Sequence, residues 1–487
     1  MISRIVNILS EAEKFVSSQS SGRSAMLAGL KSRPDGKLLR IAFMASLKNS
    51  PYGAIDSIMD ALLIKKGREK IKEKVINLYL HRQFAANDPL REYTQRKWIY
   101  HKKQLKHILN KEFYKITPVT VDIVPSLECV QNCVVCSNVD WRVNIEDKGW
   151  FNKRSRERMM TRRNMFRIID NIRKGGAKAV VFTGGGEPLT NPNTLDGIAY
   201  ARKSGLEVGL YTNGILLDEG AIDSLIKSSL TFIRISLNAG SPMVHAQIGG
   251  YSISKDYYNR VISSLRLLAE KNRGSGNRCT VGIGYIVNPW NVYDIYLLAK
   301  TLKKIDADPR SSGGIAYFAV RPSIVHRNYR GGRQFGEHVF KKAHEIINRK
   351  VIPLLKNTGI KVIEVKSRFL AVHSREKPFD RCLASPMFSL VGPDGGMYLC
   401  VESYYGHKRC RFGDLTKERL DTIFRSRKHR KIVDNIDFRY CPPVCKMYEL
   451  NKAFDRINKT DRKTIGYIRN WFMSKSPGRP PAHVNFL

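Results

Sequence analysis

The chain has 487 residues, of which 42% are hydrophobic and 26% charged, a balance typical of a folded globular protein of two or three domains. This composition excludes a disordered protein and a fibre. No run of about twenty apolar residues occurs, and the N-terminal stretch "MISRIVNILSEAEKF" reaches acidic residues before a signal-peptide core forms. We therefore expect a cytoplasmic protein without a membrane-spanning segment.

Basic residues strongly outnumber acidic ones. There are 84 Lys and Arg against 43 Asp and Glu, which gives a net charge of +41 spread along the chain. This excess favours attraction to a polyanion or a phosphorylated substrate, while a solvated basic surface explains it equally well. A non-enzymatic, metal-stabilised RNA-binding protein is therefore one hypothesis, although the aromatic pattern of an RNP motif is absent.

The first 115 residues have the spacing of helices. The stretch "DSIMDALLIKKGREKIKEKVINLYLHRQF" places Ile71, Val75 and Leu78 on one helical face and lysines on the other. We expect residues 1–115 to form a helical N-terminal region packed on the main body. A surface for a partner or a nucleic acid is the alternative interpretation of its basic face.

From residue 116 to 325, short β-rich runs alternate with segments of helical spacing. The runs are "TPVTVDIVPS", "KAVVFTGGG", "LEVGLYTNG", "FIRISLNAG", "TVGIGYIV" and "GIAYFAVRP". This alternation predicts a parallel sheet with crossover helices, and about six repeats predict an α/β fold with a partial (β/α)6 TIM-like barrel. Polar and glycine-rich segments follow or end several of these strands, so they should meet at one mouth of the barrel.

Three further segments follow the predicted barrel. Residues 326–377 have the pattern of a helix and a strand that form a connection. Residues 378–450 hold most of the remaining cysteines and predict a small cysteine-rich α+β domain. Residues 451–487, which contain "SPGRPPAH", predict a loosely attached basic tail.

The nine cysteines are unevenly placed. Three lie in one loop, and Cys279 stands alone in a strand, where a small buried hydrophobic residue is the simplest interpretation. The other five fall in the last quarter of the chain: Cys382, Cys400, Cys410, Cys441 and Cys445. A reducing compartment argues against disulfides and favours the ligation of a metal or a cluster.

The loop "SLECVQNCVVCSN" contains Cys129, Cys133 and Cys136. Three thiolates can hold three corners of a cubic iron–sulfur cluster and leave the fourth iron open to a small molecule. Zinc is the competing metal, but a closed structural zinc site needs a fourth protein ligand. Buried thiols without a metal are the remaining alternative.

The spacing Cys129-x3-Cys133-x2-Cys136 after one strand, with "FTGGGEPLTNP" after the next, resembles the radical SAM superfamily. The resemblance implies that the three cysteines bind a 4Fe-4S cluster and that S-adenosylmethionine chelates the fourth iron. The family usually has an aromatic residue before the third cysteine, where this chain has Val135. This departure removes packing on the adenine but no ligand.

The same resemblance implies contacts to S-adenosylmethionine by position. Gly185, Gly186 and Glu187 would hold the methionyl amino group, because glycine lets the backbone approach a ligand and an anionic acceptor suits an ammonium. The stretch "RISLNAG" resembles the strand that usually contacts the ribose. Ser236 and Asn238 are therefore the candidates for that contact.

The C-terminal cysteines resemble the twitch form of the auxiliary-cluster domain, without the fuller seven-cysteine SPASM pattern. Cys382 and Cys400 bound a segment with a predicted hairpin at "PDGGMYLC", and "CPPVC" supplies Cys441 and Cys445. Four thiolates would close a second 4Fe-4S site that relays or accepts electrons. A four-cysteine zinc site is the alternative, and Cys410 either replaces one ligand or has no role in the site.

The resemblance implies that the enzyme reductively cleaves S-adenosylmethionine and that the resulting radical takes hydrogen from a substrate. A one-electron reductant such as a flavodoxin or ferredoxin is the implied partner. The stretches "KNSPYG", "GGGEPLTNP" and "VGIGYIV" also resemble the radical SAM deaminase of amino-deoxysugar biosynthesis, which favours a nucleotide-linked sugar or another small molecule. A peptide- or protein-modifying maturase is the alternative.

Overall fold

The computed structural model describes residues 95–136, 158–324, 335–364, 366–374, 377–401, 411–436, 438, 441–474 and 480–486. The chain divides into one unit of residues 94–455 and 482–487 and another of residues 1–93 and 456–481. In the second unit, the described helices are the end of α21 (Tyr448–Lys459) and α22 (Arg462–Ser474). The helical region predicted for residues 1–115 lies outside the described residues up to residue 94.

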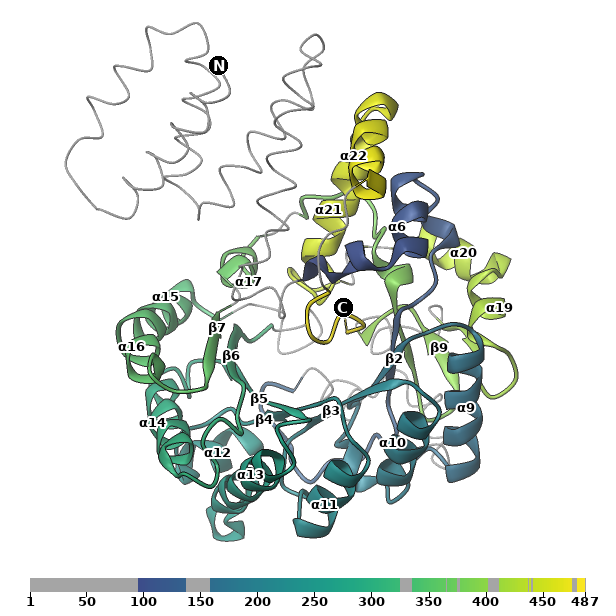
Figure 1. Cartoon of the computed structure of the whole chain (residues 1–487). Coiled ribbons are helices and arrows are strands. Elements are labelled where there is room, and N and C mark those ends of the chain that lie inside the picture. The colour runs from purple at the N-terminus through teal and green to yellow at the C-terminus, as the bar shows by residue number, and fades with distance from the viewer. Residues whose placement is uncertain are drawn as a thin grey trace, which may run out of the picture. The chain divides into compact units, whose positions relative to one another are not determined.

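One ten-stranded sheet runs through the larger unit in the order β10-β9-β8-β1-β2-β3-β4-β5-β6-β7 (Figure 1). The strands are β1 (Thr120–Ile123), β2 (Ala179–Phe182), β3 (Glu207–Thr212), β4 (Phe232–Ser236), β5 (Thr280–Val287), β6 (Tyr317–Pro322), β7 (Lys361–Glu364), β8 (Phe388–Val391), β9 (Gly396–Tyr398) and β10 (Arg411–Asp414). All pairs from β8 through β1 to β7 are parallel. The predicted α/β fold with a barrel-like parallel sheet is confirmed.

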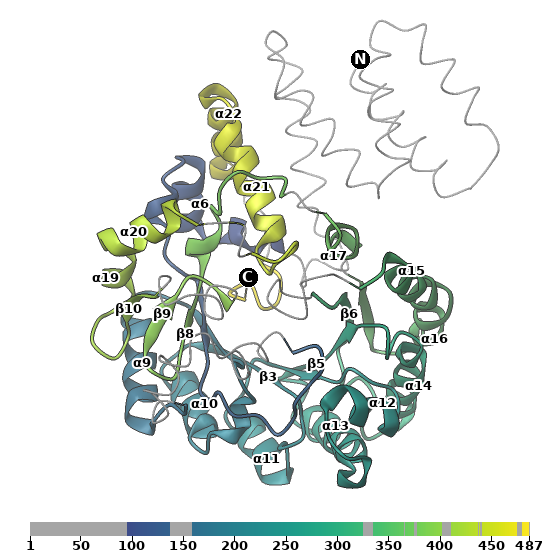
Figure 2. The same cartoon turned by 180° about the vertical axis from the view of Figure 1, so that it is seen from behind.

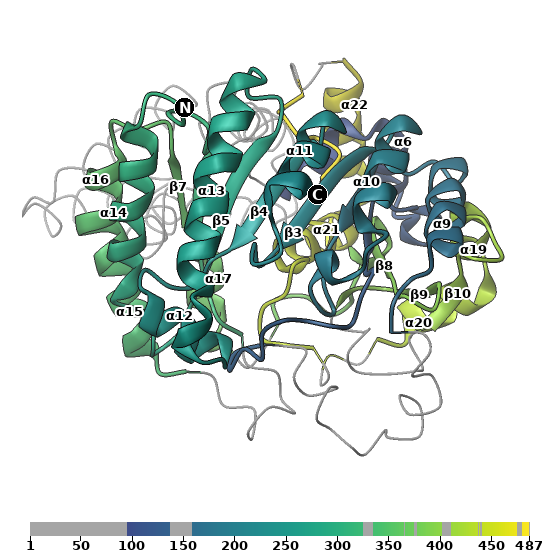
Figure 3. The same ribbon diagram turned by 90° about the horizontal axis from the view of Figure 1, so that it is seen from below.

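Helices cover the outer side of this sheet, as Figures 1 and 3 show. They are α9 (Arg162–Lys174), α10 (Thr194–Lys203), α11 (Glu219–Lys227), α12 (Pro242–Gly249), α13 (Tyr257–Gly274), α14 (Asp294–Ala307) and α15 (Glu337–Ile346), which continues through a π-helical turn (Ile347–Val351) into α16 (Ile352–Leu355). The short helix α17 (Lys366–Ala371) follows β7, the edge strand of the sheet. Thr161 and Asp218 cap α9 and α11, since their side chains accept from backbone N–H groups of the first turn. No described helix is both long enough and apolar enough to cross a bilayer.

The two faces of the barrel strands differ in composition. In β4, Ile233 and Ile235 are fully buried and belong to the core that the strands share with the surrounding helices. Val281 and Ile283 of β5 are likewise fully buried and belong to the same core. Because successive side chains of a strand point to opposite faces, the alternate residues of these strands line the inside of the barrel.

The parallel sheet extends beyond the six strands of the predicted barrel. The strand expected after the barrel is β7, which pairs with β6. On the other side, β8 of the cysteine-rich region pairs in parallel with β1, with Thr120 opposite Phe388. The cysteine-rich region, which also includes α19 (Leu420–Phe424) and α20 (Arg427–Asp434), therefore continues the barrel sheet (Figure 2).

The prediction of a loosely attached tail is wrong for the last described residues. His483 Nε2 lies 2.7 Å from Thr280 Oγ1, and Asn485 donates to Glu207 over 2.7 Å. The Phe486 ring packs edge-on against Phe232. The barrel partners are the first residues of β3, β4 and β5, so this segment fills the N-terminal end of the barrel. The aromatic and polar side chains of the segment find partners there that its sequence does not indicate.

Candidate active site

The cysteine loop after β1 is bound directly to the glycine-rich loop after β2. Gly186 N–H donates to Ser126 O over 2.9 Å, and Glu187 N–H donates to Glu128 O over 2.7 Å. A Cβ on Gly186 would lie 2.0 Å from Glu128 O, a distance that no side chain tolerates. The absence of a side chain at Gly186 thus lets the two loops meet backbone to backbone.

The structure places the Glu187 side chain among protein donors. It is 3% exposed, and its carboxylate accepts from Thr212 Oγ1 and Asn213 N–H, each over 2.7 Å, and from Leu189 N–H over 3.2 Å. Burial raises the pKa of this carboxyl, and the three hydrogen bonds oppose the rise. Glu187 therefore joins the loop after β2 to the loop after β3. Its contact with a methionyl amino group stays a prediction.

A second glycine turn holds the other side of the cysteine loop. Asn132 N–H donates to Gly249 O over 2.8 Å, at the end of α12. Gly250 has a φ of +63°, and a Cβ there would lie 2.4 Å from Asn132 O. The following Tyr251 bonds through its hydroxyl to Nδ1 of His245. The cysteine loop is thus held on one side by Gly186 and Glu187 and on the other by Gly249 and Gly250.

The three loop cysteines are half-buried and lie in the loop that these contacts hold. Cys129 Sγ accepts from Gln131 N–H over 3.4 Å and from Asn213 Nδ2 over 3.7 Å. Among the described residues, no three His, Cys, Asp or Glu side chains are arranged to hold a single metal ion. Each cysteine of a cubic cluster binds its own iron, and three thiols from one loop with N–H donors on a sulfur fit such a cluster.

The two ribose candidates lie at the end of β4. Ser236 is its last residue, and Asn238 follows it. Asn238 Oδ1 accepts from Ile286 N–H of β5 over 2.8 Å, and its backbone carbonyl accepts from Asn291 Nδ2 over 2.8 Å. Asn238 therefore links the β4 and β5 ends, on the same edge of the sheet as the cysteine loop.

In the C-terminal set, the four candidate cysteines are half-buried. Cys382 Sγ accepts from Asn451 Nδ2 over 3.3 Å, and burial is the main cause that raises the pKa of its thiol. Lys377 fixes the turn between Cys441 and Cys445 by donating to both proline carbonyls of "CPPVC". Cys410 lies outside the described residues.

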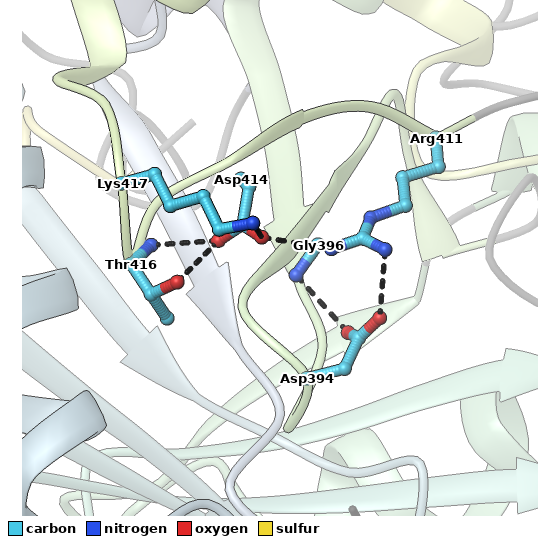
Figure 4. A network of polar contacts seen from close by, with 6 residues as sticks. All are labelled: Asp394, Gly396, Arg411, Asp414, Thr416 and Lys417. Atoms are coloured by element: carbon cyan, nitrogen blue, oxygen red, sulfur yellow. Dashed lines mark hydrogen bonds and ion pairs between the residues drawn. The ribbon is translucent and has the colours of Figure 1, made fainter. Parts of the chain in front are cut away.

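The hairpin predicted at "PDGGMYLC" is present, since β8 and β9 pair antiparallel. A polar network at its turn supports it (Figure 4). Asp394 Oδ1 accepts from Gly396 N–H over 3.0 Å, and Arg411 pairs with Asp394 at 3.6 Å and with Asp414 at 3.1 Å. Asp414 also accepts from Thr416 N–H over 2.9 Å. These contacts fix β9 and β10, the strands on either side of Cys400 in the sequence.

Several residues at the site were not among those predicted from the sequence. The pair Gly249 and Gly250 at the end of a helix is a recognisable C-cap signal, but its contact with the cysteine loop is not local. Arg234 and Arg321 are easier to recognise in the sequence. Each is a charged residue in an otherwise apolar strand, at a position that alternates with the core residues of that strand.

Two family models match the chain. Residues 123–296 match the model described as "Radical SAM superfamily", a segment that contains the cysteine loop and the β1 to β5 ends. Residues 382–447 match the SPASM model, described as "Iron-sulfur cluster-binding domain", and contain all four candidate cysteines of the C-terminal set.

Two curated proteins are similar over part of the chain. One is dTDP-4-amino-4,6-dideoxy-D-glucose ammonia-lyase of Streptomyces venezuelae, 29% identical over 179 residues, which are 36% of this chain and 34% of that protein. The other is PqqA peptide cyclase of Gluconobacter oxydans, 28% identical over 138 residues, which are 28% of this chain and 36% of that protein. The matches thus span only about a third of each relative.

Among solved structures, the chain is similar to Streptococcus suis SuiB bound to the precursor peptide SuiA. The identity is 14% and the TM-score 0.51, with 86% of this chain and 89% of SuiB covered. At this identity the similarity concerns the fold, which extends over most of both chains.

Proposed function

The chain is a radical SAM enzyme with a C-terminal iron–sulfur cluster-binding domain, and on that premise we propose that it acts on a phosphorylated small molecule such as a nucleotide-linked sugar. When bound, the 4Fe-4S cluster and S-adenosylmethionine supply a 5'-deoxyadenosyl radical that removes hydrogen from the substrate. The main observation in support of an active site at this position is the backbone contact of Gly186 with the cysteine loop.

In this proposal, Cys129, Cys133 and Cys136 hold the barrel cluster. The N–H groups that point at Cys129 Sγ stabilise a thiolate at that position. The carboxylate of Glu187 fixes the loop after β3 by accepting hydrogen bonds from Thr212 and Asn213. The segment of Gly185, Gly186 and Glu187 faces the methionyl amino group.

Two further sets of residues complete the proposed site. Ser236 and Asn238 contact the ribose from the end of β4. Four cysteines of the C-terminal domain hold an auxiliary cluster that accepts or relays an electron, and the match to an iron–sulfur domain favours a cluster over zinc: Cys382, Cys400, Cys441 and Cys445.

Two observations support a phosphorylated substrate. The ammonia-lyase that resembles this chain carries a dTDP-linked sugar in its name. The net charge of +41 suits a phosphate-bearing ligand, although a solvated basic surface explains it equally well. A flavodoxin or ferredoxin in the cytoplasm is the proposed reductant. The match to the radical SAM superfamily favours an enzyme over the hypothesis of a non-enzymatic RNA-binding protein.

A peptide substrate is the second candidate. It is supported by the similarity to PqqA peptide cyclase, which is 28% identical over the matched segment. The two candidates differ in what should be consumed when the reduced enzyme and S-adenosylmethionine are present. We expect a nucleoside diphosphate amino sugar to disappear in step with 5'-deoxyadenosine formation. Turnover of a short peptide, with none of the sugar, would favour the second candidate.

The cluster assignment is tested by Cys133→Ala in anaerobically reconstituted protein. We expect the variant to lose about four irons per chain of a total of about eight, and to form no 5'-deoxyadenosine. Cys279→Ala is the matched control, since Cys279 is a buried thiol in the core, immediately before β5. Cleavage of S-adenosylmethionine by the Cys133 variant would refute the assignment.

A further inference from the structure

Two arginines lie on the inner side of the barrel, on strands that are separated by β5. Arg234 lies in the middle of β4 and Arg321 near the end of β6, at positions that alternate with core residues. On the intervening strand β5, Gly282 lies opposite Arg234 and Ile286 lies opposite Arg321, with Gly284 between them on the same face. A Cβ at Gly284 would lie 3.2 Å from Cδ of Arg234, so the arginine stem occupies the space that the missing side chain leaves.

The positive charges at this position are not neutralised by a carboxylate in the part of the chain that the structure describes. Arg234 stacks on Tyr211, with Cζ 3.6 Å from the ring centroid, and its buried Nε has no hydrogen-bond partner. Repulsion from Arg234, then burial, then repulsion from Arg368 of α17 lower the pKa of Arg321 to about 9. Like charges that repel one another in a partly desolvated site are stabilised by a bound anion.

We propose that Arg234 and Arg321 bind the phosphate or diphosphate group of the substrate, an inference that rests on the proposed function and specifies its substrate class. Each guanidinium presents a planar fork of donors that matches phosphate oxygens. The charge of two cations is balanced better by a dianion than by the single negative charge of a carboxylate. Ser323, two residues beyond Arg321, adds a buried hydroxyl without a hydrogen-bond partner among the described residues.

The position of the pair fits this role. Arg234 lies two residues before Ser236, so it is deeper in the barrel than the end of β4 and the cysteine loop. The N-terminal end below it is filled by the segment that carries Phe486. A substrate that binds through its phosphate at Arg234 therefore extends toward the mouth of the barrel, where the radical is formed.

The test is calorimetric titration of inorganic pyrophosphate into the reconstituted holoenzyme, in the presence of saturating S-adenosylmethionine. We expect the wild type to bind, and Arg321→Gln and Arg234→Gln each to weaken binding by about tenfold or more, because each removes charge-assisted hydrogen bonds. Arg310→Gln, which removes an exposed arginine paired with Asp308, is the matched control and should bind as the wild type does.

The inference would be overturned by a lack of pyrophosphate binding in the wild type, by unchanged binding in both barrel variants, or by competition between pyrophosphate and S-adenosylmethionine. The last would show that the arginines hold the methionyl carboxylate instead. Equal binding of acetate would likewise contradict a phosphate site. Formation of 5'-deoxyadenosine without substrate, measured on the same samples, reports on the proposed function separately and should persist in both barrel variants.

Discussion

The two ends of the barrel are closed by different means. At the N-terminal end, residues 482–486 fill the opening with side chains: Phe486 lies 4.7 Å from Phe232 between ring centroids, and His483 and Asn485 bond to the first residues of strands. At the C-terminal end, loops meet through backbone groups, at Gly186 and Gly250.

This difference separates what holds the fold from what holds the site. Side chains that fill the N-terminal end can be exchanged for others of similar size at a modest cost in stability. The backbone contacts at the C-terminal end tolerate no added Cβ, because a Cβ at Gly186 would collide with a carbonyl oxygen of the cysteine loop itself. Substitutions at the two ends should therefore have distinct effects on cluster binding.

The largest effect is expected for Gly186→Ala. The added Cβ would lie 2.0 Å from Glu128 O, so the loops must separate and lose two backbone hydrogen bonds. Loss of both would cost roughly 2–6 kcal/mol in unfolding free energy, and the barrel cluster should not assemble. Urea unfolding and iron analysis measure the two effects. Gly274→Ala, at the open end of α13, should change neither, and normal iron content in the Gly186 variant would show that the contact is dispensable.

The free energy of unfolding should depend on pH through His483, at the N-terminal end of the barrel. Burial, and next the charge of Lys97, lower the pKa of this imidazole from 6.5 to about 4. The unfolded state therefore takes up the proton first, and stability is lost as the pH falls from about 6.5 to about 4, by up to about 3 kcal/mol.

His483→Asn should remove most of this pH dependence. Asparagine is neutral at all these pH values, and it tolerates the left-handed conformation that His483 adopts, with φ of +57°. The measurement is the free energy of unfolding of both proteins between pH 4 and 7. Parallel curves would mean that other buried groups, such as His101, dominate the acid response.

The sequence indicated the parts of the molecule that depend on local patterns. The strand and helix alternation predicted the parallel sheet, and the "PDGG" turn predicted the hairpin of β8 and β9. Contacts between distant segments were not indicated. The pairing of β8 with β1 joins residues 388 and 120, and the bond between His483 and Thr280 spans 203 positions. No periodicity encodes such partners.

The candidate site shows the same division. The position of Glu187 after a strand was enough to place it at the mouth of the barrel, but not to show which groups its carboxylate would meet. In the structure, the hydroxyl of Thr212 at the end of β3 and the N–H of Asn213 just after it donate hydrogen bonds to that carboxylate. The inward arginine of β4 was visible as a charge within "FIRIS", yet only the neighbouring Gly284 shows that its side chain has room inside the barrel.

The smallest predicted effect concerns the link between the loop after β3 and the cysteine loop. Asn213 Nδ2 lies 3.7 Å from Cys129 Sγ, and a hydrogen bond to a cluster sulfur raises the reduction potential because it stabilises the more negative, reduced state. A net hydrogen bond of about 1 kcal/mol corresponds to about 40 mV for one electron, so Asn213→Ala should lower the potential by up to that amount. Redox titration followed by electron paramagnetic resonance measures it, with exposed Asn259→Ala as the control. An unchanged potential in the Asn213 variant would mean that the amide serves only its other bond, to Ile215 N–H.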